Sequence, residues 1–66
     1  MNYIISNDKD GQMDTTHTLE KAFTIAKKYS ENETDTLFYI ALETEQEGDL
    51  DVASFLNGDQ LFGKVL

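Results

Sequence analysis

The segment TLFYIALETEQEGDLDVASFL, residues 36–56, decides the fold. Its first half is rich in branched and aromatic residues, which favour strands, so we expect a strand over residues 36–45. Its second half predicts another strand over residues 50–56. The same half also matches a short helix with Asp49 as N-cap and Gly58 as C-cap. The sequence alone leaves that alternative open.

Acidic residues occupy every second position where the two predicted strands meet, in ETEQEGDLD, residues 43–51. A three-residue loop that ends at the glycine of this segment would join the strands. In that register Glu45 faces Asp49 and Glu43 faces Asp51. Like charges placed opposite each other destabilise a sheet, by roughly 0.2–1 kcal/mol for each pair. We therefore expect these acids to serve something other than folding.

This register divides the hairpin into two faces of different polarity. A two-residue turn at Asn57-Gly58 would add a last strand in the same phase, pairing Asp51 with Lys64 and Leu50 with Val65. The expected core face holds Phe38, Ile40, Leu42, Leu50, Val52 and Leu56. The other face combines acids with aromatic rings, as protein-binding surfaces often do. Its candidate partner-binding residues are Tyr39, Glu43, Glu45, Asp49, Asp51, Phe55 and Phe62.

The remaining elements complete a single domain over residues 1–66. They are a strand over residues 2–6, a turn over 7–11, a strand over 12–16, a helix from Leu19 to about Tyr29 or Glu31 with Thr18 as N-cap, and a closing strand over 60–66. The order β-β-α-β-β-β predicts an α+β fold, with one helix on one face of a mostly antiparallel sheet. One helix covers one face, so the other face is expected to stay open.

Composition narrows the class of partner. The chain has 13 acids, five lysines and no arginine, giving a net charge of −8. Direct binding to nucleic acid or to an anionic membrane needs clustered positive charge, which this chain lacks. A basic protein is the partner that such a charge attracts. The absence of cysteine, of a signal peptide and of an apolar run of about 20 residues leads us to expect a cytoplasmic protein.

No pattern in the chain predicts catalysis, a cofactor or a metal site. His17 is the only histidine, the serines lack a nucleophile motif, and the glycines form no phosphate-binding loop. Residues 6–17 resemble a calcium loop, but Ser6 and His17 stand where acidic ligands are needed. We therefore expect a protein that is not an enzyme.

The layout YIIS…HTLEKAFTIAKKYS…TLFYIALETE, a strand, a helix and a strand, resembles the small acidic proteins that phages and plasmids use against bacterial defence. These are anti-CRISPR and anti-restriction proteins of the DNA-mimic type, and the resemblance extends over the length of the chain. It implies an inhibitor that binds a basic, DNA- or RNA-handling defence protein, in the host cytoplasm if the chain is phage-encoded.

The spacing of the acids supports mimicry, because alternate residues of a strand lie about 6.6 Å apart. That distance is of the order of the spacing of phosphates along one DNA strand. A second class of function stays open: a small assembly module, homo- or hetero-oligomeric, whose acids only solvate it. The oligomeric state is not predicted.

Overall fold

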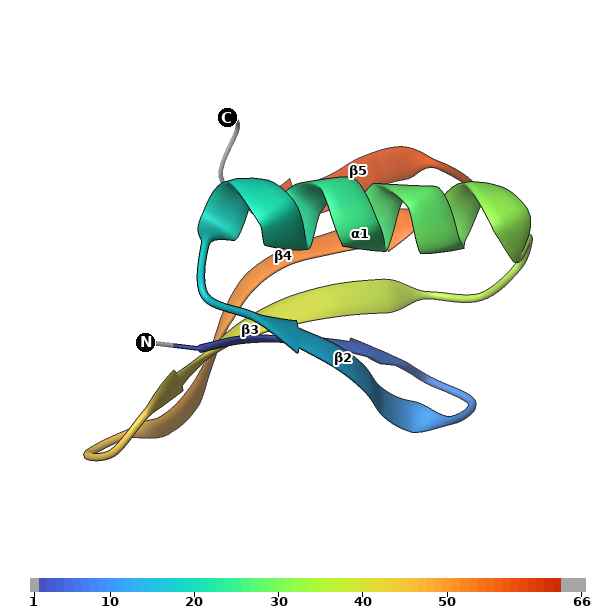
Figure 1. Ribbon diagram of the computed structural model, residues 1–66. Helices are drawn as coiled ribbons and strands as arrows, with labels where there is room; N and C mark the ends of the chain where they lie inside the picture. The colour runs from blue at the N-terminus through green and yellow to red at the C-terminus, as the bar shows by residue number, and fades with distance from the viewer. Residues whose placement is uncertain (1, 64–66) are drawn as a thin grey trace.

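The computed structural model describes residues 2–63 and shows one helix packed against a five-stranded antiparallel sheet, an α+β fold. The strand order is β2-β1-β3-β4-β5, and the helix lies across one side of the sheet (Figure 1). The elements are β1 (Tyr3–Asn7), β2 (Gly11–Thr16), α1 (Leu19–Asn32), β3 (Phe38–Thr44), β4 (Gly48–Leu56) and β5 (Asp59–Gly63). The predicted element order is confirmed, and the alternative helix over residues 49–58 is wrong because β4 occupies that segment.

Side chains cap both the β1–β2 turn and the start of helix α1. In the β1–β2 turn the buried Asn7 accepts hydrogen bonds through Oδ1 from the backbone N–H groups of Lys9, at 3.1 Å, and Asp10. Thr18 is the N-cap of α1, as predicted, and its Oγ1 accepts a hydrogen bond from the N–H of Lys21 at 3.2 Å. These bonds satisfy turn and helix-end amides that would otherwise lack partners.

The core lies between α1 and the three central strands. Two small residues of the helix, Ala22 and Ala26, are fully buried and let the helix approach the sheet closely. Aromatic rings fill the space beside them. Phe23 meets Phe55 edge-on at 5.5 Å, and Tyr29 stacks on Phe38 at 5.8 Å, both measured between ring centroids.

A β-bulge in β4 changes which residues face the helix. Thr44 pairs with Gly48 and Glu43 with Asp49, so the loop is residues 45–47 rather than 46–48. The register then shifts between Ile40 and Ala41, which leaves Val52 without a partner in β3. The predicted register is therefore wrong at both places, although the predicted left-handed glycine is confirmed, with a φ of 74° at Gly48.

The bulge inverts the phase of the inner half of β4. Ala53 and Phe55, expected on the open face, pair with Ile40 and Phe38 and are buried beneath the helix. Leu56, expected in the core, consequently falls on the open face. Leu50 is 42% exposed, because it lies on the outer part of the β3–β4 hairpin, which extends past the helix (Figure 1).

The last hairpin begins as predicted and then shifts register. Asn57 and Gly58 both have positive φ, at 53° and 85°, so the two-residue turn is confirmed. Phe55 pairs with Gln60, but a second bulge at Leu61 brings Phe62 opposite Ser54 instead of Ala53. The predicted pairings of Lys64 and Val65 lie outside the described residues.

Candidate functional site

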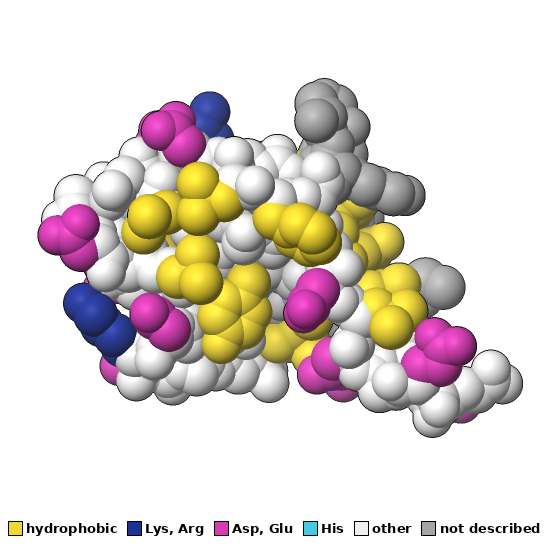
Figure 2. Space-filling view, turned by 180° about the vertical axis from the view of Figure 1, so that it is seen from behind, with side chains coloured by type: hydrophobic (Ala, Val, Ile, Leu, Met, Phe, Trp, Pro, Cys, Tyr) yellow, Lys and Arg dark blue, Asp and Glu magenta, His cyan; other side chains and the backbone are white. Residues whose placement is uncertain are grey.

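The face of the sheet opposite α1 carries an apolar patch bordered by acids. Strand alternation, corrected for the two bulges, places on it side chains from β1, from β3 and the residue before it, and from β4 and β5. Figure 2 shows hydrophobic side chains gathered in the middle of this face, with acidic side chains around them. We call this surface the open face. Its apolar members are Ile4, which is buried, and the more exposed Leu37, Tyr39, Ala41, Leu56 and Phe62.

The aromatic residues of the open face stand in one row across the sheet. Ser6 pairs with Tyr39, Tyr39 with Ser54, and Ser54 with Phe62. The Tyr39 hydroxyl donates a hydrogen bond to the carbonyl oxygen of Asn7 at 3.4 Å, which fixes the direction of the ring. Phe62 is 58% exposed on the edge strand. The two rings are therefore separated by one small residue, and neither is covered by the helix.

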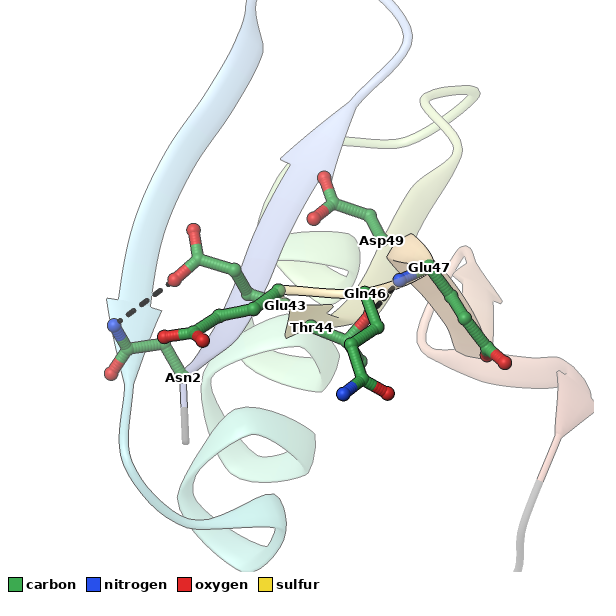
Figure 3. A pocket seen from close by; sticks show the side chains of 7 residues that line it. Asn2, Glu43, Thr44, Gln46, Glu47 and Asp49 are labelled. Carbon is green, nitrogen blue, oxygen red and sulfur yellow. Dashed lines mark hydrogen bonds between the residues drawn. The ribbon is translucent and has the colours of Figure 1, made fainter.

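Acids gather where the β3–β4 hairpin leaves the body of the sheet. Glu43 and Asp49 are direct cross-strand partners, and Figure 3 shows their carboxylates on the same side of the hairpin, with Glu47 directed away from them. Glu43 is held at its backbone and its side chain by Asn2, whose carbonyl accepts from the Glu43 N–H at 2.9 Å and whose Nδ2 donates to Oε1 at 3.4 Å. A polar amide thus supports this carboxylate.

The hairpin tip is shaped by the Thr44 side chain. Its Oγ1 donates to the carbonyl of Gly48. It also accepts from the N–H of Glu47 at 3.1 Å (Figure 3). An open hollow beside the tip is lined by Asn2, Glu43, Thr44, Glu45, Gln46, Glu47 and Asp49. Four of those seven residues are acidic, so the tip is a region of concentrated negative charge.

The structure brings most of the sequence-predicted site residues together. Tyr39, Glu43, Asp49, Asp51 and Phe62 fall on the open face by the observed register. The placement of Glu45 opposite Asp49 is wrong, because Glu45 is in the turn.

Phe55 is the second correction among the site residues. It is 3% exposed and packs edge-on against Phe23 of the helix, so it belongs to the core. The Val52 bulge is the cause, since it turns residues 53 and 55 inward.

The open face also contains residues that the sequence reading did not single out. Leu37 lies just before β3, Leu56 ends β4, and Ser54 stands between the two aromatic rings. The sequence did not predict Leu56 and Ser54 on this face, because the prediction assumed an unbroken alternation along β4. Leu37 could have been predicted, because it lies two residues before Tyr39 and alternate residues of a strand share a face.

Among residues 2–63, no group of three or more His, Cys, Asp or Glu side chains is arranged to hold a metal ion. No helix within that same range is long and apolar enough to cross a membrane. His17 is exposed in the connection before α1.

No protein-family model matches the chain, and neither the curated proteins nor the solved structures gave a match.

Proposed function

We propose that this protein is a non-enzymatic inhibitor that binds a basic, nucleic-acid-handling protein in the cytoplasm through its open face. The observation that carries the proposal is an apolar, aromatic centre bordered by acids on the sheet face that the helix leaves uncovered. Aromatic anchors inside a polar rim are typical of protein-binding surfaces. The proposed occupant is therefore another protein.

The distribution of charge supports a basic partner. Helix α1 has three lysines against two glutamates, a net charge of +1, whereas the whole chain has a net charge of −8. The negative charge is thus concentrated away from the helix. Glu43, Asp49 and Asp51 contribute to it on the open face itself. Carboxylates crowded in this way attract a groove that is built to hold phosphates.

The same arrangement supports mimicry of nucleic acid in a limited stretch. Asp49 and Asp51 are alternate residues of β4, about 6.6 Å apart, and Glu43 stands directly across from Asp49. The bulge ends this row, because Ser54 is the next residue of β4 that returns to the open face. The proposed mimic therefore presents a short cluster of charge beside apolar side chains.

A second candidate function is assembly with another subunit. It is favoured by the edge strand β5, where Leu61 and Phe62 are 59% and 58% exposed and no further strand follows within residues 2–63. Exposed apolar side chains on an edge strand favour pairing with a second chain. In that case the acids would only solvate the protein.

Affinity capture from bacterial lysate tests the first proposal. The wild-type protein is compared with Glu43→Lys/Asp49→Lys and with a control, Glu31→Lys/Glu33→Lys, which changes the net charge by the same amount. Glu31 and Glu33 are exposed at the C-terminal end of α1, where lysine complements the helix dipole. We expect the wild type and the control to recover the same basic, nucleic-acid-binding proteins, and added duplex DNA to displace them.

Equal recovery by all three proteins would contradict the role of the open face. Recovery of acidic partners, or of partners that DNA does not displace, would contradict the basic nucleic-acid-handling class. A protein that captures only its own copies would favour the assembly function.

A further inference from the structure

A notch crosses the open face between the two aromatic residues. It is lined by Leu37, Tyr39, Asp51, Ala53, Ser54 and Phe62, and its volume of about 320 Å³ is at the lower end of the range for small-molecule sites. A space of this size suits one inserted side chain better than a larger ligand. None of its lining residues comes from the hairpin tip, so it is distinct from the acidic hollow there.

Register sets the width of the notch. Tyr39 and Phe62 are both cross-strand partners of Ser54, so their strands lie two spacings apart, about 9.6 Å. The small Ser54 side chain leaves the space between the rings open. The space is lined by both aromatic side chains, and a ring face attracts a cation that lies within about 6 Å of the ring centroid.

Register also sets what closes the two ends of the notch. Asp51 pairs with Ala41, two residues beyond Tyr39, whereas Leu37 is two residues before it. The notch therefore has aromatic walls, an aliphatic end and a carboxylate end. That order matches a long cationic side chain, whose methylene stem is apolar and whose head is charged.

The geometry points to an arginine side chain of the partner protein as the occupant of this notch, with its guanidinium between Tyr39 and Phe62 and paired with Asp51. Guanidinium is planar, weakly hydrated and able to stack on aromatic faces while forming a bidentate pair with a carboxylate. An ammonium group is compact and strongly hydrated, so lysine fits the two walls less well. The inference rests on the proposed function, because it supplies the basic partner with its anchoring residue.

A titration with a small probe tests the notch without the partner. Amide spectra of the isotope-labelled protein are recorded at low ionic strength with increasing N-acetyl-arginine N-methylamide. We expect saturable shifts centred on Tyr39, Asp51, Ser54 and Phe62. The neutral isostere N-acetyl-citrulline N-methylamide should cause no such shifts, and the lysine analogue should bind at least about threefold more weakly.

Variants of the notch locate the binding. Asp51→Asn and Phe62→Leu should each raise the Kd for the arginine probe at least about threefold, and Phe62→Leu keeps apolar bulk while removing the ring. The matched control is Glu47→Gln, which removes one charge from a side chain directed away from the other acids (Figure 3). It should leave the Kd within about twofold. The dispersion of each amide spectrum shows whether the variant is folded.

Three results would contradict the inference that the notch binds arginine: equal binding of the citrulline probe, equal binding of the lysine probe, or weakening by Glu47→Gln as large as that by Asp51→Asn. If the arginine probe does not bind while the lysate capture still depends on Glu43 and Asp49, the inference of an arginine site is wrong and the proposed function is retained. If the probe binds while capture is the same for all three proteins, the inference of an arginine site is retained and the proposed function is wrong.

Discussion

Gly63 of β5 pairs with Ala53 and lies against the bulge in β4. Its φ is 106°, and a Cβ added there would lie 2.0 Å from the carbonyl oxygen of Val52. We predict that Gly63→Ala lowers the free energy of unfolding by more than about 2 kcal/mol, because backbone strain is added to a clash with backbone atoms. Denaturant unfolding measures this loss.

Gly48 is a matched control for that prediction. It also has a positive φ, 74°, but nothing lies within 4 Å of an added Cβ. Gly48→Ala should cost only the left-handed backbone penalty, about 1–2 kcal/mol. Equal losses for the two variants would mean that β5 does not approach the bulge as described.

Asp49 is predicted to reduce stability, because it stands directly across from Glu43. Replacing it by the isosteric amide, Asp49→Asn, should raise the free energy of unfolding by about 0.2–1 kcal/mol at low salt, and by less at high salt. Glu47→Gln, which removes a charge from the turn, should have a smaller effect. A loss of stability in Asp49→Asn would refute the like-charge strain.

At the scale of elements, β4 is two half-strands that face opposite ways. In its outer half the odd-numbered residues Asp49 and Asp51 face away from the helix, and in its inner half Ala53 and Phe55 face toward it. One bulge residue, Val52, allows a single strand to supply both the acids of the open face and part of the core. This change of phase is the basis of the candidate site.

That change of phase also limits what the sequence could predict. Periodicity and turn chemistry sufficed for the order of the elements, the Thr18 cap, the Asn57-Gly58 turn and the burial of Phe38 and Ile40. They failed for Phe55, because Leu50 and Val52 before it are apolar in the opposite phase. An unbroken alternation fits those residues equally well, and only packing against α1 selects the bulged register.

Helix α1 is joined to the β4–β5 turn by one buried hydroxyl. Ser30 is fully buried, and its Oγ accepts from the Gly58 N–H at 2.8 Å while donating to the Lys27 carbonyl at 3.1 Å. Ser30→Ala should lower the free energy of unfolding by about 1–3 kcal/mol, because the Gly58 N–H loses its acceptor.

Thr24 offers the control on the same helix. Its hydroxyl also donates to a backbone carbonyl, that of Glu20 at 3.1 Å, but the residue is exposed and accepts no hydrogen bond from the β4–β5 turn. Thr24→Ala should change stability by no more than about 0.5 kcal/mol. Thermal unfolding of both variants decides the matter, and equal effects would contradict the role assigned to Ser30.

At the scale of the whole molecule, charge is unevenly distributed, with a net charge of +1 on α1 and −8 on the whole chain. Lys21, Lys27 and Lys28 are exposed on α1, while acids border the open face on the other side of the sheet (Figure 2). Such crowding of like charge opposes folding and is screened by salt. We predict that the melting temperature rises by several degrees between about 20 mM and about 200 mM NaCl.

The Glu43→Lys/Asp49→Lys variant should show less of that salt effect than Glu31→Lys/Glu33→Lys, although the two have the same net charge. The reason is that only the first relieves the crowded hairpin. Identical salt responses would mean that net charge alone, and not its placement, governs the stability.

The central claim is that the open face binds a basic surface in place of nucleic acid, and the affinity of the purified, captured partner as a function of salt tests it most directly. We predict that the Kd rises at least about tenfold between about 50 mM and about 300 mM NaCl, and that the rise is smaller for Glu43→Lys/Asp49→Lys. A Kd that stays constant across the salt series would contradict the claim, because it would indicate an apolar assembly contact in which the acids take no part.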